Sequence, residues 1–135
     1  MRLLNGLNAF AREIHENAKA HGWYDPPPSF PEVISTFHSE LSEALEEYRA
    51  GKPNLYCGKD NEHGGECISV ECGTCSCLNG DCGEEKPQGI AVELADAIIR
   101  ILDTCAHMGI DIEAAIAMKH EYNKSREFRH GGKKI

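Results

Sequence analysis

The chain has 135 residues, of which 41% are hydrophobic and 27% charged, and its net charge is −8. This length suits one domain with its own core, and the acidity argues against a nucleic-acid polymer or an anionic membrane as partner. No apolar run approaches the roughly 20 residues that a membrane span needs. Because the N-terminus also lacks the apolar region of a secretory signal, we expect a cytoplasmic protein whose seven cysteines are reduced or metal-bound.

Apolar residues recur at three- and four-residue spacing over residues 3–21, which predicts an amphipathic helix. His15 and His21 are expected at its surface. Trp23 follows this helix and precedes three consecutive prolines, which forbid a helix. Two roles fit Trp23 equally: it can stack on a nucleobase, or it can cover the end of a helical bundle.

Residues 30–50 form the next predicted helix, with Ser29 as its N-cap. Within this helix Glu40, Glu43 and Glu47 fall within roughly 60° of one another, at about 100° per residue. Like charges at this spacing repel each other, and a bound cation would remove the repulsion. Taken alone, the strip is best explained as an acidic face exposed to water.

Residues 52–88 differ in character from the rest of the chain. They are rich in Gly, Asn, Asp and Glu, show little periodicity, and hold six of the seven cysteines. A structureless loop of this length is uncommon inside a compact domain unless something holds it together. We therefore predict a single domain over residues 1–135 with an irregular Cys-rich insertion at 52–88.

The cysteine spacing in the insertion indicates a metal site. Cys72-x-x-Cys75-x-Cys77 has the spacing of a zinc knuckle, which predicts one structural Zn²⁺ with these three residues as ligands. The fourth ligand can be any of the remaining donors: Cys57, Cys67, Cys82 or His63. Disulfides are the main alternative, and an insertion with free thiols is the third.

Residues 88–107 form a second acidic helix, in which apolar residues cover an arc of roughly 220°. A surface helix needs an apolar stripe only somewhat wider than about 100°, so this helix should be covered on most sides, and we expect a homo-oligomer. Glu93 and Asp96 lie in the remaining polar strip, where burial requires pairing or a metal. Together with Glu40 and Glu43 they can surround Mg²⁺, which takes carboxylates, water and substrate phosphates.

The last predicted helix spans residues 111–127. Its apolar stripe starts at Ile112 and runs along one face into Lys119, Asn123 and Arg126. Lys and Arg bind phosphate oxygens, and Asn can orient a sugar hydroxyl or a water. The alternative is that the cations are simply favoured by the negative end of the helix dipole.

With these three patterns, the chain resembles the MazG-like all-α nucleoside triphosphate pyrophosphohydrolases. The signature of that family is an E-x-x-E helix followed by an E-x-x-D helix, and the resemblance covers residues 1–50 and 88–130. The segment between the two acidic helices is usually much shorter in the family than the Cys-rich insertion here.

The resemblance implies an all-α, four-helix bundle that assembles as a homodimer or homotetramer. It also implies Mg²⁺ or Mn²⁺ bound by Glu40, Glu43, Glu93 and Asp96, with the basic residues of the last helix near the substrate phosphates. The implied reaction converts a (d)NTP into (d)NMP and pyrophosphate. One of Glu40, Glu43 or Glu47 would serve as the general base, and of these we expect Glu40 or Glu43.

Two other classes of protein fit parts of the pattern. In an adaptor protein, the Cys-rich module would be the working part and the helices only a scaffold. A di-iron carboxylate bundle would use Glu-x-x-His pairs, and neither acidic helix has a His three residues after its key Glu. That difference argues against iron.

Overall fold

The computed structural model describes residues 6–60, 66–68 and 87–127. This part of the chain contains four helices, α1 (Leu7–Ala20), α2 (Phe30–Arg49), α3 (Ile90–His107) and α4 (Ile112–Ser125). It also contains three short strands, β1 (Tyr56–Asp60), β2 (Glu66–Ile68) and β3 (Pro87–Gln88). The predicted helical character is confirmed, and the helices lie where the sequence periodicity placed them. None of these helices is both long and apolar enough to cross a membrane.

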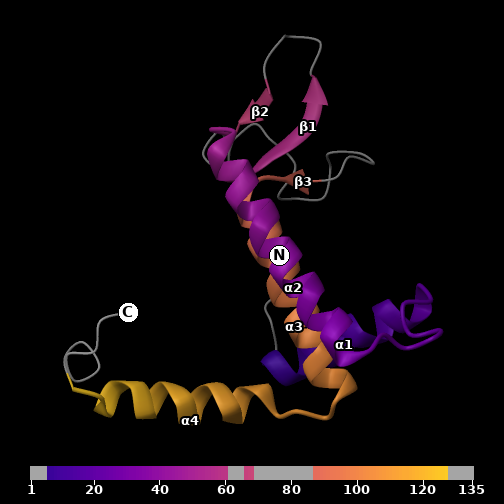
Figure 1. Cartoon of the computed structure of the whole chain (residues 1–135), viewed down its shortest axis with the longest axis vertical. Helices are drawn as coiled ribbons and strands as arrows, with labels where there is room; N and C mark the ends of the chain where they lie inside the picture. Colours follow the sequence, from indigo (N-terminus) through magenta and orange to yellow (C-terminus); the bar gives the residue numbers. More distant parts are fainter. Residues whose placement is uncertain (1–5, 61–65, 69–86, 128–135) are drawn as a thin grey trace.

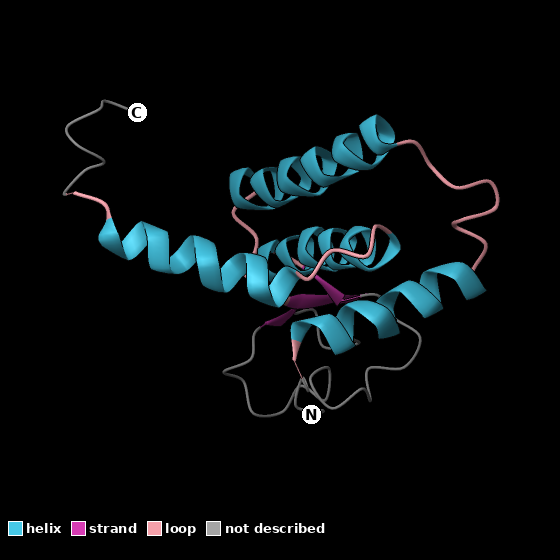
Figure 2. Ribbon diagram, turned by 90° about the horizontal axis from the view of Figure 1, so that it is seen from below, coloured by secondary structure: helices cyan, strands magenta, loops and turns pink. Residues whose placement is uncertain are grey.

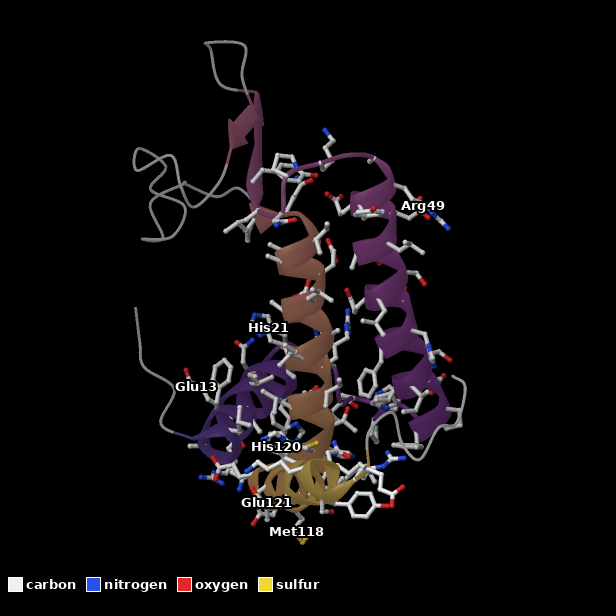
Figure 3. The ribbon with its side chains drawn as sticks, turned by 90° about the vertical axis from the view of Figure 1, so that its left-hand side faces the viewer. Glu13, His21, Arg49, Met118, His120 and Glu121 are labelled. Carbon is white, nitrogen blue, oxygen red and sulfur yellow. The ribbon has the colours of Figure 1, made fainter. Side chains whose placement is uncertain are left out.

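The helices α2 and α3 run side by side along the long axis of the molecule, and α1 packs against α3 (Figures 1 and 3). Small residues lie buried on each of the three helices: Ala11 on α1, Ala44 on α2 and Ala97 on α3. Short side chains at such positions let helices approach each other closely. Leu102 and Cys105 are the other buried hydrophobic residues of α3, so the hydrophobic core is thin and is centred on that helix.

Local sequence signals explain where the helices begin. At the start of α2, the backbone N–H and the hydroxyl of Ser29 both donate to Glu32 Oε2 at 2.7 Å. The Ser29 side chain also accepts from the backbone N–H of Glu32, which completes a capping box. At the start of α4, Asp111 accepts from the N–H of Ala114 at 3.0 Å. Gly89 precedes α3 with φ of 111°, and a Cβ there would lie 2.5 Å from the carbonyl oxygen of Asn54, so only glycine fits.

The described part of the Cys-rich insertion is more regular than expected. Its three strands form an antiparallel sheet in the order β2-β1-β3, with Cys57 opposite Cys67 and Tyr56 opposite Gln88. The sheet lies where α2 ends and α3 begins (Figure 1). Strands of two to five residues are too short to show a period-two pattern in the sequence, which is why the insertion was predicted to be irregular.

The helix α4 extends away from the other three (Figure 2), and none of its residues is buried. It is attached to α1 through Asn8, whose side-chain amide donates to Asp111 Oδ1 at 2.7 Å and whose side-chain oxygen accepts from the N–H of Ile112 at 3.1 Å. In the single chain, therefore, α1, α2 and α3 pack together, and the predicted fourth member of the bundle lies outside it.

Candidate metal centre

Three of the four acids predicted to bind a metal come together between α2 and α3. Carboxylate oxygens of Glu40, Glu93 and Asp96 all lie within 4.8 Å of one another, and we call these three residues the acid cluster. Glu40 and Glu93 are only 6% and 7% exposed, and Asp96 is partly buried. The i, i+3 spacing of Glu93 and Asp96 puts both on the side of α3 that meets Glu40.

Arg100 lies one turn beyond Asp96 on α3, and its Nε donates to Glu40 Oε1. The positive charge of Arg100 offsets part of the negative charge of the acid cluster, which is largely buried between α2 and α3. Buried charges are stable only when they are paired or bound to a metal. A hard divalent cation with oxygen ligands fits the donor set, because carboxylates are the protein ligands that Mg²⁺ prefers.

The other two glutamates of the predicted acidic strip lie elsewhere in the single chain. Glu43 is exposed on α2 and is not part of the acid cluster. Glu47 accepts a hydrogen bond from the hydroxyl of Tyr56 at 2.8 Å, so it holds the first strand of the sheet against α2. Of the three candidate general bases, only Glu40 lies among the clustered acids.

Trp23, the predicted base-stacking residue, lies close to the acid cluster through Arg100. The guanidinium carbon of Arg100 is 5.1 Å from the centre of the Trp23 ring, a cation–π distance. Trp23 is 57% exposed. Two cavities of about 270 and 380 Å³ share Trp23, Arg100 and Asp103 in their walls, and the larger one also reaches Asp96.

Asp103 is held by residues that sequence reasoning did not connect with it. His15 Nδ1 lies 2.7 Å from Asp103 Oδ1, and Tyr24 also hydrogen-bonds this carboxylate. Burial, and then the hydrogen bond to Asp103, raise the pKa of the Tyr24 hydroxyl well above its usual range. The rings of His15, Tyr24 and His107 contact one another, with centroids 4.6 to 5.4 Å apart.

His15 therefore differs from the surface histidine that we expected, because only 13% of its side chain is exposed. His21 is exposed, as predicted. The place of Asp103 on the polar strip of α3, seven residues after Asp96, was visible in the sequence. Its partners on α1 and in the following loop come from positions about 80 to 90 residues earlier in the chain, and no local pattern could reveal them.

The single chain does not bring the predicted phosphate ligands to the acid cluster. Lys119 Nζ and the guanidinium carbon of Arg126 lie 4.9 and 5.8 Å from the ring centre of Tyr122, on α4 itself. Lys119 and Asn123 line an open hollow on the same helix. Figure 3 shows α4 at one end of the molecule, with Met118, His120 and Glu121 labelled on it.

The zinc prediction falls mostly outside the described residues. Cys72, Cys75, Cys77 and Cys82 lie there, and so does His63. Cys57 and Cys67 are opposite each other in the backbone pairing of β1 and β2. The zinc site stays a prediction.

Comparison of the chain with protein-family models, with curated proteins and with solved structures gives no significant match.

Proposed function

We propose that this chain is a Mg²⁺- or Mn²⁺-dependent nucleoside triphosphate pyrophosphohydrolase of the MazG-like kind, which converts a (d)NTP into (d)NMP and pyrophosphate. The observation that carries the proposal is the acid cluster. Its three carboxylates come from the E-x-x-E and E-x-x-D motifs, and they meet within 4.8 Å in a poorly exposed place.

The donor set suits the proposed reaction. A bound divalent cation supplies charge neutralisation at the phosphates and a more acidic water molecule, and phosphoryl chemistry depends mainly on positioning and on such neutralisation. In the proposed step, a water oxygen bonds to the α-phosphorus, pyrophosphate leaves, and a carboxylate of α2 takes the proton from the water. Glu40 and Glu43 are the candidates for that carboxylate.

A homodimer or homotetramer belongs to the same proposal. Large apolar side chains are exposed on the two acidic helices, among them Leu45 at 46%, Tyr48 at 71% and Ile98 at 56%. A second copy of the chain would cover them. Since α4 extends beyond the bundle of its own chain, such an assembly can place the cations of α4 near the acid cluster of its partner, where opposite charges attract.

A nucleotide panel tests the proposed reaction. Each (d)NTP is incubated with the full chain and Mg²⁺, and orthophosphate is measured with and without added inorganic pyrophosphatase. We expect orthophosphate only when pyrophosphatase is present, and no turnover in EDTA. Orthophosphate without pyrophosphatase would mean that a different bond is cleaved, and no turnover of any nucleotide would refute the proposal.

A further inference from the structure

The larger of the two cavities extends from the acid cluster along α3. It lies between α1 and α3, has a volume of about 380 Å³, and is lined by Asp96 and, farther along α3, by Arg100 and Asp103. Seven residues of helix, from Asp96 to Asp103, rise by roughly 10 Å. The volume of the cavity falls in the range of small-molecule sites. A ligand with phosphates at Asp96 would thus extend its other end toward Asp103.

The walls of this cavity carry groups that recognise a flat, polar ring. Trp23 presents an exposed indole, and aromatic side chains stack on nucleobases. Asn17 and His21 lie in the wall on the α1 side, and Figure 3 shows His21 beside α3. Asp103 supplies a carboxylate, which in its ionised form can only accept hydrogen bonds.

The Asp103 carboxylate is oriented before any ligand binds. His15 on α1 and Tyr24 in the following loop both hydrogen-bond it. A carboxylate offers about four acceptor positions, so these two contacts leave capacity for a ligand. A side chain held in this way loses little freedom on binding, which favours selectivity.

We propose that this cavity holds the nucleobase and that Asp103 selects bases that carry an exocyclic amino group. This inference rests on the proposed function and names the substrate class of the same site. An amino group donates to the carboxylate, whereas a keto oxygen at the same place would face it with another negative partial charge. Asp103 is thus a specificity-determining residue, distinct from the carboxylates of the acid cluster.

The smaller cavity gives a matched control. It lies on the α2 side of Trp23 and Arg100, has a volume of about 270 Å³, and is lined by Glu32 but by no residue of the acid cluster. Glu32→Gln removes a carboxylate charge that lines the smaller cavity alone, whereas Asp103→Asn removes one that lines both cavities. Only the second change should alter base preference.

Binding of nucleoside monophosphates to the full chain tests the inference without requiring catalysis. Trp23 is the only tryptophan in the sequence, so quenching of its fluorescence reports stacking at this site. The informative comparisons are dGMP with dIMP, dAMP with dIMP, and dCMP with dUMP, because one base of each pair lacks the amino group. We expect at least one amino-bearing nucleotide to bind tighter by about tenfold or more, with Asp103→Asn abolishing the difference and Glu32→Gln preserving it.

The inference is overturned if no nucleotide quenches the fluorescence, if no pair differs, or if the difference survives Asp103→Asn. Should that variant fail to fold, Asp103→Glu keeps the charge beside His15 and moves the carboxylate by one methylene. The preference should then fall in the same assay, and an unchanged preference would overturn the inference.

The inference and the proposed function can fail separately. Turnover of nucleotides without selection by Asp103 would refute only this inference. Selection by Asp103 without any turnover would refute only the proposed hydrolysis.

Discussion

Arg100 connects the acid cluster with the cavities on either side of Trp23. Its Nε donates to Glu40, its guanidinium lies over the Trp23 ring, and its side chain lines both cavities. Arginine suits this position because its planar group can donate a hydrogen bond in its own plane and stack through its face. One side chain thereby places the candidate base-stacking residue beside the candidate metal ligands.

The first prediction concerns the acid cluster itself. Asp96→Asn should lower pyrophosphohydrolase activity by at least about a hundredfold, since even residues that only support a metal ligand contribute roughly ten- to a hundredfold. In EDTA the variant should be as stable as the wild type or more stable, because one of three mutually repelling charges is gone. Thermal melts with EDTA and with Mg²⁺ measure this: the cation should stabilise the wild type more than the variant.

Glu46→Gln is the matched control for that experiment. Glu46 is an exposed acid on α2 that pairs with Arg49 on its own helix at 2.8 Å. Its substitution should leave both activity and the response to Mg²⁺ unchanged. A large loss of stability in Asp96→Asn in EDTA would show instead that Asp96 serves as a structural partner for a positive charge.

At the scale of elements, local chemistry could be predicted from the sequence and long-range contacts could not. The cap at Ser29 and the apolar periodicity depend on neighbours along the chain, and both were predicted from the sequence. The same periodicity placed Glu93 and Asp96 on one strip, so most of the acid cluster followed from the sequence. The exclusion of Glu43 and the bond between His15 and Asp103 depend on how helices pack, which no single segment encodes.

The start of α2 should depend on pH through Glu32. Hydrogen bonds from the Ser29 hydroxyl and backbone lower the pKa of Glu32 below its usual value of 4.5. A group whose pKa is depressed by folding contributes stability above its unfolded pKa, and the contribution is lost as the pH falls through the lower, folded value. Glutamine can still accept the capping hydrogen bonds but does not titrate.

Melting curves of the wild type and Glu32→Gln should therefore converge in acid. We expect the wild type to melt at the higher temperature at about pH 6, where the glutamate is charged next to the positive end of the helix dipole. The difference should shrink as the pH falls below 4.5 and Glu32 becomes protonated in the folded protein. A difference that does not change with pH would show that the charge on Glu32 is irrelevant to the cap.

The Cys-rich insertion gives a prediction that rests on sequence alone. Protein purified without added metal should contain about one Zn²⁺ per chain, because thiolate sites supply much of the folding free energy of small modules. The double variant Cys72→Ser, Cys75→Ser should lose the metal. Cys105→Ser is the control and should keep it, since Cys105 is a buried core residue on α3 whose thiol pKa is raised by burial.

Elemental analysis combined with a thiol count under denaturing conditions measures that result. Zinc with at least three free thiols in the insertion would agree with the prediction. Three disulfides and no zinc would contradict both the metal site and the expected reducing compartment.

At the scale of the whole molecule, the exposed apolar side chains of α2 and α3 predict an oligomer. Leu41, Leu45 and Tyr48 recur at helical spacing on α2, and Leu94, Ile98 and Ile101 do so on α3; all six are exposed. Contiguous apolar surface of this kind marks an interface in soluble proteins. Light scattering at micromolar concentration should therefore give the mass of a dimer or tetramer.

Ile98→Glu tests which surface makes the contact. A charge at this position should shift the mass toward that of the monomer, because burying an unpaired carboxylate in an interface is costly. Ser39→Glu adds the same charge to an exposed polar position on α2 and should leave the mass unchanged. A monomeric wild type would contradict the oligomer, and an unaffected Ile98→Glu would place the interface elsewhere.

The last prediction concerns whether the cations of α4 complete a site at the acid cluster of another subunit. Asp96→Asn damages the acid cluster, and Lys119→Ala damages the cationic face of α4, so each variant alone should have little activity. If the two parts of a site come from different protomers, subunit exchange between the variants creates one undamaged site in each mixed dimer. Activity should then reappear on mixing. If each chain supplies its own α4, every site in the mixture retains one defect, and activity stays low.

Mixing Asp96→Asn with Glu40→Gln is the control: both changes lie in the acid cluster, so every site carries one of them whichever chain supplies α4. Recovery in the first mixture but not in the second would show that α4 acts between subunits. Absence of recovery, once subunit exchange is verified by mass, would mean that Lys119 does not act at the acid cluster of another subunit. It would then be a cation favoured only by the negative end of the helix dipole.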